Sequence, residues 1–221
     1  MKSDRVIWDW NGTLLDDAWL CVEVLNGMLA RRRMPAVDMA AYRNRFRFPV
    51  RAYYEEIGFD FVREPFEIVA AEFISEYDRR RHECRLRRGA RSALKTLADA
   101  GLAQCVLSVY PQPRLEDATE RFGLRPFFDG VFGLPDHHAR GKIEAGRRLA
   151  AALGPGRGRA VMIGDTLHDH EVAREMGVRL VLVNGGHQSP DRLRACGAPV
   201  ADSLEAAASL VLAGRAQNCG R

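Results

Sequence analysis

The sequence predicts an α/β fold in which a doubly wound parallel sheet carries an inserted α-helical cap domain. Short apolar runs alternate with segments of helical periodicity, which is typical of a parallel sheet covered by helices on both faces. A helical block without strand signals separates the first apolar run from the others. We therefore expect a core domain formed by residues 1–14 and 86–221, and a cap domain formed by residues 15–85 and hinged over the core.

The first predicted strand is short, apolar and followed at once by polar residues. Residues 6–8 read VIW, and residues 9–13 read DWNGT. Ligands collect at the carboxyl ends of parallel strands, and an acid buried at such an end is costly unless it is paired. The carboxylate of Asp9, the glycine turn and the hydroxyl of Thr13 therefore indicate a place that holds an anionic group.

Four helices are predicted in the cap. The first and the fourth show apolar residues on one side at helical spacing. Asp38 can cap the second helix, while Pro49 and Pro65 suit the first turns of the third and fourth. We expect these helices over residues 18–31, 38–46, 49–58 and 65–81.

Helices and strands alternate after residue 88. The glycine-rich segment 154–159 leads into a strand and not into a helix, so we interpret it as a loop and not as a phosphate-binding loop. His137 and His138 are expected in an exposed loop, and residues 217–221 in a frayed tail. Strands are predicted over residues 105–107, 127–132, 160–163 and 180–183. Helices are predicted over residues 89–100, 114–122, 142–153 and 203–213, and a further helix follows the strand at 160–163 and ends at residue 176.

Polar residues stand at the ends of three predicted strands. They are Asp9, Ser108 and Asp165, and the carboxyl ends of neighbouring parallel strands converge. Lys142 opens a helix of the same core. Taken alone, Ser108 is typical of a turn and Lys142 of a surface lysine, and Asp165 with Asp169 is typical of a helix start. Their occurrence together favours one functional site.

These segments resemble the four motifs of the haloacid dehalogenase superfamily in their order along the chain. Residues 9–13 resemble the first motif, D-x-D-x-T, and Ser108 resembles the second. Lys142 resembles the third, and GDTLHD at residues 164–169 resembles the fourth, G-D-x-x-x-D. The helical insertion directly after the first motif is similar to the cap of the phosphoglycolate-phosphatase-like branch. The resemblance implies a Rossmann-like core and a hydrolase that acts on a small phosphorylated metabolite.

The resemblance also implies a role for each motif residue. Asp9 would be the nucleophile and would form an aspartyl-phosphate. Mg²⁺ would bind to Asp9, Asp165 and the backbone carbonyl of Asn11. Asp169 would support this metal site from one helical turn further on. Lys142 would balance the carboxylates and hold the nucleophile.

The phosphate and the rest of the substrate need ligands of their own. Thr13, Ser108 and backbone N–H groups would bind the phosphate oxygens. The cap carries the stripe Arg43, Arg45 and Arg47, which is typical of a solvated face. As a hypothesis, one of these arginines, for which we choose Arg47, binds the anionic remainder of the substrate.

Asn11 departs from the family pattern, because most phosphatases of the family have a second Asp there. An amide cannot shuttle a proton, and general acid–base help is typically worth about 10²–10⁴-fold. The chain is therefore a phosphatase with another base (Asp16, Asp17 or His187), an enzyme of different chemistry, or a weakly active protein that binds metal and phosphate. Dehalogenation needs no Mg²⁺, and the cap, residues 15–85, lacks the lysine that phosphonatases use. We therefore favour the first interpretation.

The composition argues against several other classes of protein. The net charge of +4 is too mild to indicate nucleic-acid binding, and no apolar run approaches the ~20 residues of a membrane span. Five scattered cysteines without a C-x-x-C pattern indicate reduced thiols. The first strand follows Met1 closely, so we expect no signal peptide and a cytoplasmic location.

Overall fold

The computed structural model describes residues 5–134 and 141–218, and its core is an α/β domain. Within these residues, six strands form one parallel sheet in the order β5-β4-β1-β6-β7-β8. This sheet confirms the predicted fold class. The predictions for His137, His138 and the last residues of the tail lie outside the described part of the chain. The strands are β1 (Arg5–Trp8), β4 (Ala103–Pro111), β5 (Gly130–Leu134), β6 (Ala160–Gly164), β7 (Arg179–Val183) and β8 (Val200–Ala201).

β1 lies inside the sheet, between β4 and β6. Arg5 of β1 pairs with Ala103 of β4 on one side and with Ala160 of β6 on the other. The chain first extends the sheet through β4 to β5 and only then returns to β6, so the direction of strand addition reverses at β1. In open parallel sheets, ligands bind beyond the carboxyl ends of the strands at such a reversal. The fold therefore puts the end of β1 at the expected place for a site.

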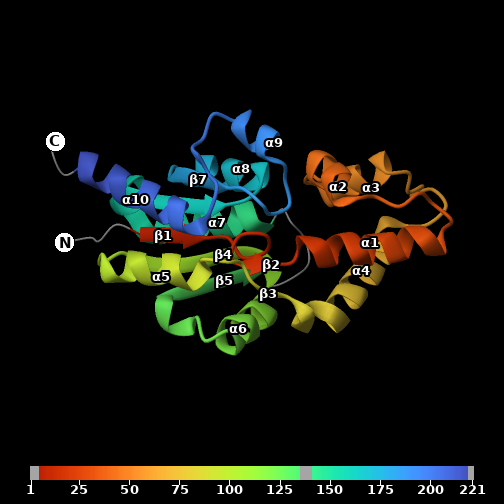
Figure 1. Cartoon of the computed structure of the whole chain (residues 1–221), viewed down its shortest axis with the longest axis horizontal. Coiled ribbons are helices and arrows are strands. Elements are labelled where there is room, and N and C mark those ends of the chain that lie inside the picture. The colour runs from red at the N-terminus through yellow and green to blue at the C-terminus, as the bar shows by residue number, and fades with distance from the viewer. Residues whose placement is uncertain (1–4, 135–140, 219–221) are drawn as a thin grey trace.

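Helices cover both faces of the sheet (Figure 1). Alternate residues of a strand point to opposite faces, and Trp8 and Ile7 accordingly belong to different apolar clusters. No helix in the described ranges is both long and apolar enough to cross a membrane. The covering helices are α5 (Ala90–Asp99) and α10 (Leu204–Asn218) on the Trp8 face, and α7 (Gly141–Leu153) and α8 (Leu167–Met176) on the Ile7 face.

Residues 15–85, all of which the structure describes, contain four α-helices that lie at one end of the core (Figure 1). Asp38 caps the second of them by accepting a hydrogen bond from the Ala41 N–H at 2.7 Å. The helices are α1 (Ala18–Arg31), α2 (Met39–Arg45), α3 (Val50–Glu56) and α4 (Phe66–Arg80).

Two short strands that the sequence did not predict join the cap to the core. β2 (Leu15–Asp16) and β3 (Arg85–Leu86) pair as an antiparallel ribbon. The expectation that residues 15–85 contain no strand was therefore wrong. A strand of two residues carries no periodic signal that the sequence could reveal.

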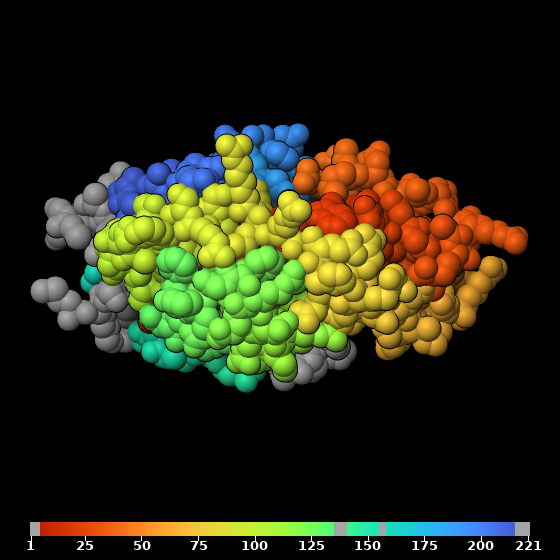
Figure 2. Space-filling model, turned by 60° about the horizontal axis from the view of Figure 1, so that its bottom comes forward, coloured from red at the N-terminus to blue at the C-terminus, as the bar shows by residue number. Residues whose placement is uncertain are grey.

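The cap also meets the core away from this ribbon. Figure 2 shows that the orange cap segment abuts the blue core segment that contains α9 (Pro190–Arg194). Arg43 of the cap donates to the carbonyls of Gly185 and Gly186, at 2.9 Å in each case. The Ser189 N–H donates to the Arg43 carbonyl at 3.0 Å. The core loop after β7 is therefore held against the cap.

Several predicted bounds in the core differ from the structure. β4 continues through Ser108 to Pro111, with a register shift against β5 between Leu107 and Pro111, so Ser108 lies within a strand and not at its end. The predicted strand over 127–132 begins only at Gly130, and residues 154–159 form a 3₁₀-helix and not a loop. α9 and β8 are too short to show a period. The remaining elements are α6 (Gln112–Arg121) and the 3₁₀-helices η1 (Arg81–Glu83), η2 (Arg125–Phe127) and η3 (Gly154–Arg159).

Candidate active site

Asp9 stands at the carboxyl end of β1, inside the sheet. Its backbone N–H donates to the Ile163 carbonyl of β6 at 2.9 Å, which ties the end of β1 to the neighbouring strand. Asp165 directly follows β6, and both carboxylates are almost fully buried. The parallel pairing of β1 with β6 therefore brings together two acids from distant parts of the sequence.

The ammonium group of Lys142 links Asp9 to Asp169. Lys142 lies in the first turn of α7, and its Nζ is 2.5 Å from Asp9 Oδ1 and 2.6 Å from Asp169 Oδ1. Burial alone would lower the pKa of Lys142, but the carboxylates of Asp169 and Asp9 raise it. Lys142 is therefore a buried cation that holds the Asp9 carboxylate in place.

Asp169 uses both of its oxygens within the protein. Oδ1 binds Lys142, and Oδ2 accepts hydrogen bonds from the Thr166 N–H at 3.0 Å and the Thr166 hydroxyl at 2.8 Å. Thr166 caps α8 in return, which forms a capping box at the start of this helix. Burial would raise the pKa of Asp169, but Lys142 and Thr166 lower it. Asp169 therefore orients Lys142 and anchors α8.

Thr13 connects Asp9 to Asp165. Together with Asp169, these two acids form a group that we call the acidic cluster. The Thr13 hydroxyl lies 2.8 Å from Asp165 Oδ1 and 3.2 Å from Asp9 Oδ2. One oxygen from each acid lies within 4.8 Å of the other two. Burial raises the pKa of Asp9 to about 8, since the opposing effect of Lys142 is partly cancelled by the neighbouring carboxylates.

The acidic cluster has more negative charge than Lys142 can balance. Among the described residues, its three carboxylates have one ammonium group in direct contact, and His187 acts on Asp165 from the neighbouring loop. Excess charge in a buried site is costly, and hard divalent cations such as Mg²⁺ prefer oxygen ligands of this kind. The oxygens of Asp9 and Asp165 therefore fit a metal ion, whereas those of Asp169 already bind Lys142 and the start of α8.

Two glycines allow the chain to close tightly around Asp165. A Cβ atom at Gly12 would lie 2.4 Å from Asp165 Oδ2, and one at Gly186 would lie 2.1 Å from the same oxygen. Gly12 also has a φ of 74°, a left-handed conformation that favours glycine. The His187 N–H donates to this oxygen at 2.6 Å. The backbone on both sides therefore fixes the Asp165 carboxylate.

Asn11 points toward Asp17 and toward a tyrosine of the cap. Its amide nitrogen donates to Asp17 Oδ2 at 2.7 Å and lies 3.0 Å from the hydroxyl of Tyr77 in α4. The Tyr77 hydroxyl donates to the same Asp17 oxygen at 2.7 Å. In the sequence, Tyr77 belongs to the apolar side of the fourth cap helix, and nothing there distinguishes it from the other residues of that side.

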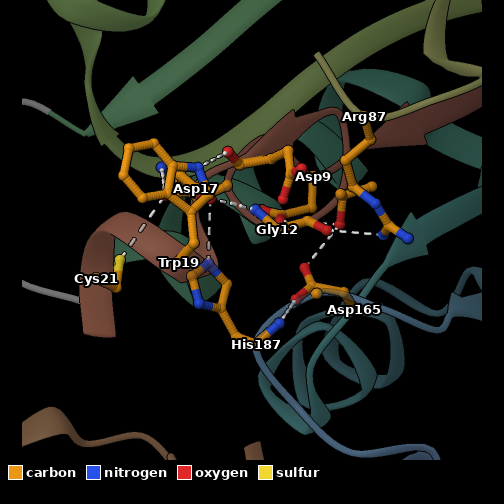
Figure 3. Close-up of polar contacts among 12 residues, drawn as sticks. Asp9, Gly12, Asp17, Trp19, Cys21, Arg87, Asp165 and His187 are labelled. Atoms are coloured by element: carbon orange, nitrogen blue, oxygen red, sulfur yellow. Dashed lines mark hydrogen bonds and ion pairs between the residues drawn. The ribbon is translucent and has the colours of Figure 1, made fainter. Parts of the chain in front are cut away.

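Asp17 and His187 form a buried pair (Figure 3). Asp17 Oδ1 accepts from the Gly12 N–H at 2.7 Å and lies 3.4 Å from His187 Nε2. Burial alone would raise the pKa of Asp17, but His187, Asn11 and Tyr77 lower it. Burial alone would lower the pKa of His187, but Asp17 and the acidic cluster raise it to about 9. His187, in the loop after β7, thus lies beside the acidic cluster and contacts Asp17, another of the bases considered from the sequence.

The other ring nitrogen of His187 contacts the cap. His187 Nδ1 lies 2.9 Å from the hydroxyl of Tyr42 in α2. Tyr42 is buried, and its ring also stacks on Phe46 with centroids 5.0 Å apart. The imidazole is therefore fixed between the loop before α1 and the second cap helix.

Ser108 and Arg47 make their contacts elsewhere in the described structure. Ser108 is buried in β4, and its hydroxyl oxygen accepts from the Tyr110 N–H at 3.1 Å. The Arg47 guanidinium forms an ion pair with Glu56 on the exposed side of the cap. The structure thus brings Asp9, the remaining predicted acids, Lys142 and Thr13 to one place, but shows no contact of Ser108 or Arg47 with them.

Comparison with known proteins gives the family of this chain. The family model of haloacid dehalogenase-like hydrolases matches residues 6–183. The chain therefore belongs to the haloacid dehalogenase-like hydrolases, as its four motifs suggest. A phosphoglycolate phosphatase of Caulobacter vibrioides is 32% identical over 85% of this chain and 81% of its own length. An N-acetylmuramic acid 6-phosphate phosphatase of Pseudomonas putida is 27% identical over 86% of this chain and 87% of its own length.

Solved structures share the same fold. A predicted phosphatase from Clostridium acetobutylicum superposes with a TM-score of 0.76 at 22% identity, covering 96% of this chain and 99% of that chain. A haloacid dehalogenase-like protein from Agrobacterium tumefaciens gives a TM-score of 0.78 at 22% identity, with the same coverage. Together with the family match and the relatives in sequence, this makes the chain a phosphatase of the haloacid dehalogenase type, a hydrolase of phosphoric monoesters.

Proposed function

We propose that this phosphatase depends on Mg²⁺ and hydrolyses a small phosphomonoester through an aspartyl-phosphate on Asp9. The observation that carries the proposal is the buried Asp9 carboxylate, held by Lys142 at 2.5 Å at the end of β1. A carboxylate with one oxygen fixed in this way can attack phosphorus with the other. The ester oxygen would leave with the alcohol, and water would then release phosphate from Asp9.

Asp9, Asp165 and the backbone carbonyl of Asn11 would hold the Mg²⁺ ion. When bound, the ion would neutralise the carboxylates and the incoming phosphate oxygens. The excess negative charge of the acidic cluster supports this assignment. Asp169 would act on the metal site only through Lys142 and α8.

Thr13, Ser108 and backbone N–H groups would bind the phosphate, and Arg47 would bind the rest of the substrate. The Thr13 hydroxyl supports this assignment most directly, because it already lies between Asp9 and Asp165. Ser108 would contribute from the neighbouring strand β4. Arg47, whose side chain is 44% exposed, would exchange its contact with Glu56 for the anionic substrate.

The Asp17–His187 pair would carry the proton transfer that Asn11 cannot perform. The pair is in direct hydrogen-bond contact with the Asn11 amide and the Gly12 N–H. Asp16, the third candidate from the sequence, is exposed and lies in the ribbon. Asn11 would then serve as a donor that orients Asp17. This interpretation favours an active phosphatase over a weakly active binding protein.

The relatives suggest which substrates to test first. Their names give N-acetylmuramic acid 6-phosphate and phosphoglycolate, which are both small phosphorylated acids. We propose a small phosphorylated metabolite of this kind, in the cytoplasm. Such a substrate has an anionic group besides its phosphate, which suits an arginine of the cap.

A phosphate-release screen over small phosphomonoesters tests the proposal, with and without Mg²⁺. Wild type should release phosphate only with Mg²⁺, and Asp9→Asn should not. Activity that survives Asp9→Asn would refute the nucleophile. Asn11→Asp tests the proton transfer: a large gain in activity would show that the Asp17–His187 pair is no effective substitute. Binding of Mg²⁺ and phosphate without turnover would favour the binding protein.

A further inference from the structure

A second buried cluster with a different chemistry lies beside the acidic cluster. Asp17 precedes α1, Cys21 lies one turn further in that helix, and His187 belongs to the loop after β7 (Figure 3). One ligand atom from each residue lies within 4.8 Å of the other two, and the carboxylate of Asp17 is shared between the thiol and the imidazole. We call these residues the mixed cluster. Carboxylate, thiolate and imidazole are the ligand types of zinc sites.

The spacing within the mixed cluster is close to that of ligands around a tetrahedral ion. Asp17 Oδ1 lies 3.4 Å from His187 Nε2, and Cys21 Sγ lies 3.9 Å from Asp17 Oδ2. With metal–ligand bonds of roughly 2.0–2.3 Å, the ligand atoms of a tetrahedral zinc site are roughly 3.3–3.5 Å apart. The two distances use different oxygens of Asp17, and one ligand atom of each residue lies within 4.8 Å of the other two, so the side chains would draw together by up to roughly 1.5 Å to enclose an ion.

Asp17 and Cys21 are brought together by the start of α1. The Cys21 N–H donates to the Asp17 carbonyl at 3.0 Å, which is the first helical hydrogen bond of α1. Residues four apart in a helix lie on the same side, so Asp17 and Cys21 face His187 together. The acidic cluster has no nitrogen or sulfur ligand among its acids, so the two clusters suit different metals.

Ion binding would release protons from the mixed cluster. A thiol loses its proton when it binds a metal, and an imidazole binds through an unprotonated nitrogen. A zinc ion would form bonds to Cys21 Sγ, to His187 Nε2 and to an Asp17 oxygen, and the protons displaced from sulfur and nitrogen would pass to solvent. These protons would offset the charge that the ion brings. A buried site opposes such an exchange far less than it opposes a net change in charge.

We propose that Asp17, Cys21 and His187 form a second metal site, for zinc or another thiolate-binding divalent ion, and that its occupation inhibits the enzyme. Asp17 also holds the Gly12 N–H and the Asn11 amide, so an ion that takes Asp17 changes the contacts of the loop after Asp9. The ion would also join α1 of the cap to the core loop. The inhibition rests on the function proposed above, whereas the binding does not.

Cobalt(II) tests the binding directly, because a thiolate ligand gives Co²⁺ an intense absorption band in the near ultraviolet. In saturating Mg²⁺, wild type should bind one Co²⁺ with this band, and Zn²⁺ should displace it. Cys21→Ser and His187→Gln should abolish the thiolate band or weaken Co²⁺ binding by at least about tenfold, because even partners outside the ligand shell are worth that much. The matched control is Cys196→Ser, a cysteine of similar exposure in a different region, which should behave as wild type.

Zinc inhibition of phosphate release in excess Mg²⁺ tests whether occupation of the mixed cluster inhibits the enzyme. Half-inhibition of Cys21→Ser should need at least about ten times more Zn²⁺ than that of wild type or Cys196→Ser. Equal inhibition of all three would overturn the inhibitory site, and a wild type without the thiolate band would overturn the binding. Asp9→Asn should keep the band, so failure of the nucleophile assignment would be seen separately.

Discussion

Asp9 and Asp17 are both buried acids of the segment between β1 and α1, but their surroundings shift their pKa values in opposite directions. Asp9 faces two further carboxylates and a single ammonium group, and its pKa is raised to about 8. Asp17 accepts hydrogen bonds from Asn11, Gly12 and Tyr77 and pairs with His187, and its pKa is lowered. The protein thus balances Asp17 with its own groups, whereas Asp9 has Lys142 and would be balanced further by the proposed Mg²⁺.

The largest expected effect is the loss of activity in Asp9→Asn. The substitution keeps the shape but removes the proposed nucleophile, so phosphate release should fall by at least about 10³-fold. Asp16→Asn is the matched control, because this neighbouring acid is exposed, and it should retain most of the activity. Comparable losses in both variants would mean that the loop, and not the Asp9 carboxylate, matters.

Asp17→Asn should reduce stability more than any exposed substitution. It leaves His187 as a buried cation without its partner, and breaking a buried pair typically costs about 3–5 kcal/mol. Chemical denaturation measures the free energy of unfolding. Asp99→Asn, which breaks the exposed pair with Lys95, should cost below about 1 kcal/mol. An equal loss in the free energy of unfolding in both variants would contradict the inference that the buried Asp17–His187 pair stabilises the fold more than the exposed pair.

Mg²⁺ should stabilise the fold through Asp9 and Asp165. At one hundred times its dissociation constant, a ligand adds about 2.7 kcal/mol to the free energy of unfolding. Thermal unfolding with and without Mg²⁺ should show this gain in wild type but not in Asp165→Asn. Cys196→Ser should keep it. A gain that persists in Asp165→Asn would place the ion elsewhere.

The stability that His187 provides should depend on pH. Folding raises its pKa from 6.5 to about 9, so its contribution is complete below pH 6.5 and is lost as the pH rises through about 9. The lowered pKa of Asp17 adds stability above pH 3.8, which is lost as the pH falls. The difference in unfolding free energy between wild type and His187→Gln should therefore shrink toward alkaline pH. His82→Gln, at an exposed histidine, should show no such trend, and a constant difference for His187→Gln would argue against the ion pair.

The smallest effect is expected from Arg47→Glu. If Arg47 binds the anionic remainder of the substrate from an exposed position, KM should rise by about 2–5-fold with kcat unchanged. Steady-state kinetics with the preferred substrate measures this. Arg51→Glu, at another exposed arginine of the cap, is the control. The role of Arg47 would be abandoned if the two variants had equal KM values.

The sequence predicts best the features that follow from the order of strands, helices and motifs along the chain. Asp9 and Asp165 could be predicted to lie at one edge of the sheet because strand ends converge in a parallel sheet, and Lys142, at the start of a helix, through its resemblance to the third family motif. The contacts of Tyr42 and Tyr77 could not, since they depend on how cap helices are rotated against the core. Ser108 was wrongly put at a strand end, because the irregular continuation of β4 depends on its pairing with β5.

The ribbon of β2 and β3 has a consequence for how such enzymes diversify. Leu15 pairs with Leu86 and Asp16 with Arg85, so the chain leaves the core and re-enters it through two hydrogen-bonded neighbours. The separation of these two crossings is fixed whatever lies between them. A different segment inserted at this junction would enter and leave at the same spacing, but it would also replace Tyr42 and Tyr77, so selectivity and the support of His187 and Asp17 would change together.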